Sequence, residues 1–206
     1  MIKRFMRASS DFVANVREDY ASVRAYRSKY NGDVKSKTEF PVDVVRKVGV
    51  QIMVAVRLMH FVRDAGIPFA PQVASRLIRH LYGADIHWDA ELAPGVSVIH
   101  GQGLIISSAA KVGTGCILFQ GVTLGEGRDS DTGAVGGPTL GEDVHVGPNT
   151  VILGPIDVGG GTKIGAGSVL TTSVPERSLV QPAEARITKR LKTNESKEVR
   201  GRGEHA

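Results

Sequence analysis

The chain of 206 residues lacks most features that would place it in a membrane or an oxidising compartment. Its one cysteine, Cys116, cannot form a disulfide within the chain, so we expect a reducing, cytoplasmic location. No apolar run approaches the ~18 residues of a transmembrane helix, so we expect no membrane span. Aromatic residues make up only 5% of the chain, and no nucleic-acid-binding motif is recognisable. The net charge of +5 therefore predicts a solvated surface or an anionic ligand such as a phosphorylated cofactor, and no nucleic-acid partner.

Glycine is plentiful, with 25 residues, and an aliphatic residue recurs at every sixth position from Leu140 to Leu170. A period of six fits neither an α-helix nor a flat strand, but it is typical of a solenoid. The same step occurs upstream in two runs, Ile86, Leu92, Val98 and Ile106, Val112, Leu118, Leu124. The pattern predicts a triangular parallel β-helix, in which each face holds one hexapeptide and a coil takes about eighteen residues.

The rest of the chain divides around these repeats. We expect an α-helical N-terminal domain over residues 1–83, the β-helix over 84–175, and a C-terminal extension over 176–206 that is largely disordered at its end. Helices are expected at about 9–30, 42–64 and 70–82. The six-residue phase breaks near residue 104 and between 125 and 139, and such loops are where a solenoid carries function.

Several segments occur in a characteristic order, namely GADIH, VIHGQGLIIS, FQGVTLGEG and VHVGPNTVILGPIDVGGGTKIGAGSVL. Over about residues 15–187 the chain resembles the serine O-acetyltransferase-like group of left-handed β-helix acyltransferases. The resemblance implies transfer of an acetyl group from acetyl-CoA to a hydroxyl acceptor. It also implies a homotrimer with its active sites at subunit boundaries.

His100 is the best candidate for a general base, because an imidazole titrates near neutral pH. Asp85 lies fifteen residues earlier, which in a coil of about eighteen puts the pair on neighbouring coils. There Asp85 would fix the tautomer of His100 and favour its protonated form. The resemblance assigns both residues the same roles. The alternative is a His–Asp pair that only holds a corner of the fold.

Gly125 and Glu126 lie where the chain leaves the stack, and their backbone N–H groups are candidates for stabilising an oxyanion. Members of the family usually carry Gly-Gly here, so Glu126 is a departure. The alternative is a simple loop exit.

The resemblance also implies where CoA binds. Its pantetheine would lie beside Pro148, Gly165, Ala166 and Gly167, held by main-chain groups. Lys163 would meet a phosphate as a point charge. An exposed lysine on a repeat face is the alternative for Lys163.

The acceptor side departs from the serine enzymes. Ile99 replaces an Asp, Gly136-Gly137 replaces Arg-His, and Arg27-Ser28 replaces Asp-Pro. Serine carries both charges, and leaving each unpaired in a partly dry site costs several kcal/mol. We therefore expect a different hydroxyl acceptor, a sugar of a polysaccharide or a hydroxylated metabolite, with serine as the alternative. A β-helix that only binds or scaffolds is the alternative of another class.

A metal site is not expected. His87 and His145 could join His100 in a cluster like that of the zinc carbonic anhydrases that share this fold. Their spacing and neighbours do not match that family. Cys116 occupies a repeat position, where a small core residue is expected.

Overall fold

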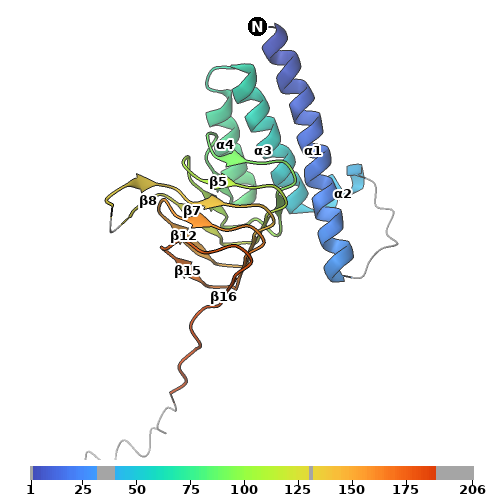
Figure 1. The fold of residues 1–206 in the computed structure, drawn as a ribbon. Coiled ribbons are helices and arrows are strands. Elements are labelled where there is room, and N and C mark those ends of the chain that lie inside the picture. Colours follow the sequence, from blue (N-terminus) through green and yellow to red (C-terminus); the bar gives the residue numbers. More distant parts are fainter. Residues whose placement is uncertain (1, 32–39, 130–131, 189–206) are drawn as a thin grey trace, which may run out of the picture.

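Four helices precede the β-helix in the computed structural model, which describes residues 2–31, 40–129 and 132–188 (Figure 1). They are α1 (Ile2–Asn31), α2 (Phe40–Arg46), α3 (Val48–Ala65) and α4 (Ala70–Tyr82). The helix expected at 70–82 is confirmed, and α1 begins earlier than expected. The single helix expected at 42–64 is wrong, because Lys47 has an extended backbone (φ −118°, ψ 108°) that separates α2 from α3.

The helices form a layer at one end of the β-helix, where α4 packs on β1 and both α1 and α3 pack on β3 (Figure 1). The buried guanidinium of Arg57 on α3 joins these parts. It donates to both carboxylate oxygens of Asp19 on α1 (2.7 and 2.9 Å) and to the carbonyls of Leu92 and Ala93 (2.7 Å each). A buried charge is tolerated when it is paired in this way.

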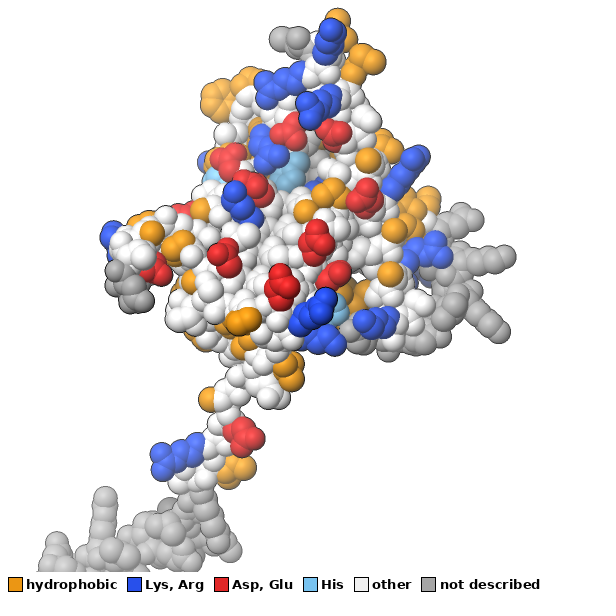
Figure 2. Space-filling view, viewed as in Figure 1, with side chains coloured by type: hydrophobic (Ala, Val, Ile, Leu, Met, Phe, Trp, Pro, Cys, Tyr) orange, Lys and Arg blue, Asp and Glu red, His pale blue; other side chains and the backbone are white. Residues whose placement is uncertain are grey.

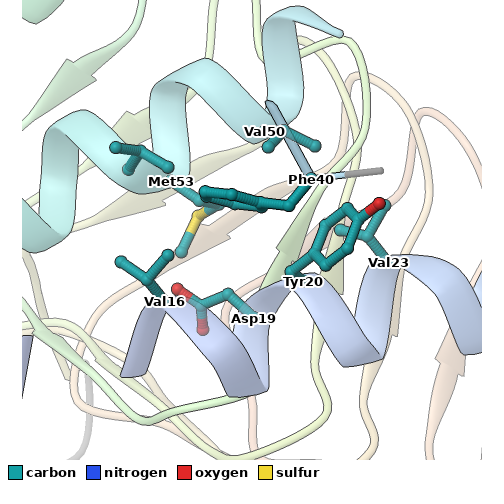
Figure 3. A pocket seen from close by; sticks show the side chains of 8 residues that line it. Val16, Asp19, Tyr20, Val23, Phe40, Val50 and Met53 are labelled. Carbon is teal, nitrogen blue, oxygen red and sulfur yellow. The ribbon is translucent and has the colours of Figure 1, made fainter. Parts of the chain in front are cut away.

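Side chains of α1, α2 and α3 meet around Phe40, whose ring lies edge-on to that of Tyr20 with centroids 5.1 Å apart (Figure 3). The void among them is about 10 Å³, lined by residues that include Val16, Val50 and Met53. Such a space holds at most one water molecule, so it is a packing gap and not a ligand site.

The repeats form three parallel sheets, as the six-residue period predicts. The first sheet has the order β1-β4-β7-β12-β15, the second β2-β5-β10-β13 and the third β3-β6-β11-β14-β16. The first sheet contains β1 (Asp85–Ile86), β4 (Ile105–Ile106), β7 (Thr123–Gly125), β12 (Val151–Leu153) and β15 (Val169–Leu170). The second contains β2 (Glu91–Leu92), β5 (Lys111–Val112), β10 (Thr139–Leu140) and β13 (Asp157–Val158). The third contains β3 (Ser97–Val98), β6 (Ile117–Leu118), β11 (His145–Val146), β14 (Lys163–Ile164) and β16 (Leu179–Val180).

The core is the interior of this triangular stack. Within the first sheet the paired residues Ile86, Ile106, Leu124, Ile152 and Leu170 lie one above another, each at most 5% exposed. Burying an aliphatic side chain of this size contributes about 1.5–3 kcal/mol, which explains why the period is kept.

Two departures from the repeat matter for function. The chain between β7 and β10 leaves the stack as an antiparallel hairpin, β8 (Gly127–Arg128) with β9 (Val135–Gly136), which projects from the side in Figure 1. The stack also continues past residue 175, where we expected it to end, because β16 pairs with β14. The predicted disorder at the end of 176–206 concerns residues 189–206, which lie outside the described residues.

The surface seen in Figure 2 mixes acidic and basic side chains, without one continuous basic patch. None of the helices in the described part of the chain is long and apolar enough to cross a membrane.

Candidate active site

Three corners separate the sheets, and the third corner, between the third and first sheets, carries most of the predicted site. It consists of residues 83–84, 99–104, 119–122, 147–150 and 165–168 in successive coils. Backbone hydrogen bonds tie these turns together. Gly103 N donates to Gly83 O (2.8 Å), Gly121 N to Gln102 O (2.9 Å), Asn149 N to Gln120 O (3.0 Å) and Gly167 N to Pro148 O (2.8 Å).

His100 lies on this corner, in the turn that follows β3. Its side chain is exposed and its backbone adopts a left-handed conformation (φ 61°), which is uncommon for a residue with a side chain. The turn is held at both sides. Ile99 N donates to Leu118 O (2.8 Å), and a Cβ on Gly101 would lie 2.4 Å from Ile52 Cδ1 of α3. Close packing against α3 therefore keeps His100 outside the stack.

Asp85 is the first residue of β1 and lies next to the same turn. A hydrogen bond from its N–H to Leu104 O (2.8 Å) joins it to the end of that turn. Its carboxylate accepts a hydrogen bond from Arg79 Nη1 of α4 at 3.1 Å. Both side chains are about half exposed, at 55% and 48%. No hydrogen bond joins Asp85 to His100 among the described residues, so their pairing stays a prediction. No motif or spacing in the sequence predicted a role for Arg79.

A cavity of about 360 Å³ opens beside His100, between the third corner, the C-terminal part of α1 and the junction of α2 with α3. Ile99 and Arg27, two of the positions that depart from the serine enzymes, line it. Arg46 and Lys47 line it as well, although no motif in the sequence predicted them. The break between α2 and α3 brings these two cations to the cavity, and no helix period signalled that break.

The residues predicted to hold CoA follow His100 along the same corner, away from the helices. Pro148 lies in the turn after β11, and Gly165, Ala166 and Gly167 in the turn after β14. Lys163 lies on β14, exposed and opposite His145 of β11. Burial, with Lys163 adding to it, lowers the pKa of His145.

The remaining predicted residues lie at a different corner, between the first and second sheets. Glu126 accepts a hydrogen bond there from Ser108 Oγ (2.7 Å), and Gly125 O accepts one from Gly154 N (3.1 Å). Gly136 ends the hairpin, and a Cβ on Gly137 would lie 2.7 Å from the carbonyl carbon of Ala109. Gly137 therefore has a packing role. None of these glycines lines the His100 cavity within one chain.

The histidines do not form a cluster. His87 stacks on Trp88 (centroids 3.8 Å apart) at the corner between the first and second sheets, whereas His145 lies on the third sheet. Within the described ranges there is no group of three or more His, Cys, Asp or Glu that could hold a metal ion. Cys116 is buried as expected, and burial raises the pKa of its thiol to about 11.

Comparison with known proteins agrees with this architecture. Residues 137–172 match the bacterial transferase hexapeptide (six repeats) family. The serine acetyltransferase of Helicobacter pylori (strain ATCC 700392 / 26695) is 34% identical over 145 residues, which cover 68% of this chain and 82% of that protein. The chain belongs to the serine acetyltransferase family.

Other members share less of their length with it. The serine acetyltransferase of Synechococcus elongatus is 38% identical over 142 residues, and the match covers 68% of this chain but only 56% of that protein. The crystal structure of Neisseria gonorrhoeae serine acetyltransferase in complex with serine superposes with a TM-score of 0.73 at 25% identity, covering 90% of this chain and 72% of that one. These likenesses confirm the left-handed parallel β-helix with an α-helical N-terminal region.

Proposed function

We propose that this protein is an acetyl-CoA-dependent O-acetyltransferase in which His100 is the general base. The observation that carries the proposal is the third corner, where His100, a cavity and the predicted CoA positions lie along one edge of the stack. Membership of the serine acetyltransferase family supports the same reaction.

The reaction needs one mobile proton. His100 takes it from the acceptor hydroxyl as the oxygen attacks the thioester carbonyl, forming the C–O bond. As the C–S bond breaks, the imidazolium returns the proton to the CoA thiolate. Asp85 would orient the imidazole, which requires its carboxylate to turn from Arg79 toward His100 when the substrates bind.

The backbone N–H groups of Gly125 and Glu126 lie on a different corner from His100, with the first sheet between them. In a threefold assembly, one subunit can present its hairpin corner to the third corner of its neighbour. We therefore propose a homotrimer in which the oxyanion donors and Gly136-Gly137 complete the partner's site. Light scattering should give about three times the chain mass of 21.9 kDa.

The names of the relatives support L-serine as the acceptor, more than they support the sugar or other hydroxylated metabolite that the sequence led us to expect. A solved relative was also determined with serine. L-Serine is therefore the first acceptor to test, and a sugar hydroxyl is the second.

The decisive experiment follows the release of CoA from acetyl-CoA by the full chain with each acceptor. His100→Ala should lower kcat by about 10²–10⁴-fold. The matched control is His80→Ala, whose side chain is exposed on α4 and whose Nδ1 hydrogen-bonds to Arg76 O of the same helix (2.7 Å). Equal, measurable activity of His100→Ala and the wild type would overturn the mechanism, whereas no CoA release by the wild type with any acceptor would favour a non-catalytic β-helix.

A further inference from the structure

The cavity beside His100 is strongly cationic, although the departures from the serine enzymes suggested an acceptor without charges. Its lining includes Arg27 of α1, Arg46 of α2 and Lys47 at the junction of α2 and α3. The described lining contains no Asp or Glu. Three cations around one space of about 360 Å³ repel one another unless an anion lies between them.

One carboxylate lies behind the wall of the cavity. Asp43 of α2 is 1% exposed, and its Oδ2 lies 2.5 Å from Lys47 Nζ and 3.8 Å from Arg27 Nη1. Tyr20 also donates a hydrogen bond to this oxygen (3.0 Å). Asp43 therefore fixes Arg27 and Lys47 in place, and the Lys47 ammonium is itself buried against this carboxylate. One buried carboxylate cannot neutralise three positive charges, so Arg27 and Arg46 are the cations left to face a ligand.

We propose that this cluster binds an anionic group, a carboxylate or a phosphate, on the hydroxyl acceptor, with Arg27 and Arg46 as the direct partners and Lys47 held against Asp43. The acceptor then needs no ammonium group, because the described lining carries cations and no carboxylate that could pair with one. This rests on the proposed acetyl transfer. An anionic acceptor also explains two departures from the serine enzymes. Ile99 stands in place of one Asp and so removes a negative charge, and Arg27 stands in place of another and so reverses the charge.

The phosphates of CoA are the other anions that could use these cations. The order of the coils argues against that. The helices pack on the coil that carries His100, whereas Pro148 and Gly165 lie in later coils on the opposite side. A CoA that follows the third corner with its thioester at His100 therefore carries its phosphates away from Arg27 and Arg46.

A small set of acceptors separates the possibilities. Glycerate has a carboxylate without an ammonium, glycerol 3-phosphate has a phosphate, L-serine has both a carboxylate and an ammonium, ethanolamine has only the ammonium, and glycerol has neither charge. We expect kcat/KM for glycerate or glycerol 3-phosphate to equal or exceed that for L-serine, and to exceed that for ethanolamine and glycerol by about 10- to 100-fold. The better of the two anions identifies the group. Efficient acetylation of ethanolamine with none of glycerate would overturn the inference while leaving acetyl transfer intact.

Variants place the effect in the cavity. Arg46→Gln should lower kcat/KM for the anionic acceptor by about tenfold, with the Kd of CoA unchanged. Arg24→Gln is the matched control, because Arg24 is exposed on α1 about one turn from Arg27 and does not line the cavity. Arg27→Asp should shift the preference from glycerate toward L-serine. A weakened Kd for CoA in Arg46→Gln would instead assign the cations to the cofactor and refute the proposal.

Binding gives a readout that does not depend on turnover. Glycerate and glycerol 3-phosphate should raise the Tm of the wild type and of Arg24→Gln, but much less that of Arg46→Gln. An anion that binds in this way without acetylation would support the cavity and count against the proposed function. Equal shifts in all three proteins, or none in any, would refute the cation cluster.

Discussion

Gly49 is the point at which α3 approaches the strand that leads to His100, and Gly49→Ala tests whether that contact sets the active site. Gly49 is buried near the start of α3, and a Cβ built on it would lie 2.0 Å from Val98 O and 3.0 Å from Val98 C. Side chains do not approach backbone atoms below 3.0 Å, so α3 or β3 must move by about 1 Å or more. The atom it meets is backbone and cannot rotate away.

The displacement should have two effects. Overpacking costs about 1–3 kcal/mol of folding free energy, measured by urea unfolding. A shift of about 1 Å in the turn that holds His100 should also lower kcat/KM by up to about 100-fold in protein that is still folded. Gly160→Ala is a control on another corner, where the nearest heavy atom lies at a milder 3.2 Å. If Gly49→Ala loses stability but keeps full kcat/KM, α3 supports the fold without positioning His100.

Three further outcomes follow from buried groups. Arg57→Met should cost about 3–5 kcal/mol in urea unfolding because it leaves the Asp19 carboxylate buried without its partner, and adding Asp19→Asn should recover part of that loss. Burial, assisted by Arg63 and Arg57, lowers the pKa of His60 to about 3. Below pH 6.5 the imidazole is therefore protonated in the unfolded chain but stays neutral in the folded one. Unfolding free energy should then fall by about 2 kcal/mol between pH 6.5 and 5, and His60→Leu should remove that dependence. Cys116, with its thiol pKa raised to about 11 and its Sγ donating to Gly141 O (3.1 Å), should resist thiol reagents until the protein unfolds, and rapid labelling of the native protein would show that its coil opens.

The β-helix was predictable because its signal is repeated. Each coil places one aliphatic residue per face toward the interior. A shift of the repeat by one residue would turn these side chains outward, so the six-residue period is strongly constrained. Leu140, Val146 and Ile152 are buried in consecutive sheets as that step requires. The end of the stack was less predictable, because β16 keeps the pairing with β14 after Pro175 has broken the period.

The helical region carried a weaker signal. An apolar stripe over 42–64 fits one helix, and only the extended backbone at Lys47 divides it. The division lies beside Asp43, whose partners Tyr20 and Arg27 come from α1, far away in the sequence. Contacts between distant segments leave no local pattern in the sequence. Arg46 and Lys47 could therefore not be predicted to line the His100 cavity, whereas Arg27 was noted because it departs from the family motif.

Arg27 and Ile99 show how motif and geometry support each other. They are far apart in the sequence, and each alone reads as an ordinary substitution. Both line the cavity that contains His100, together with two cations that no motif predicted. A site that had simply lost its serine contacts would be expected to lack charge, yet this cavity is lined by cations, two of which contact the buried carboxylate of Asp43. Because Asp43 cannot balance every cation at this cavity and excess positive charge in a half-buried space is unfavourable, the proposed anionic ligand would supply the missing negative charge. On the proposal above, the acceptor end selects by charge, while the corner proposed for acetyl-CoA carries the small residues Gly165, Ala166 and Gly167.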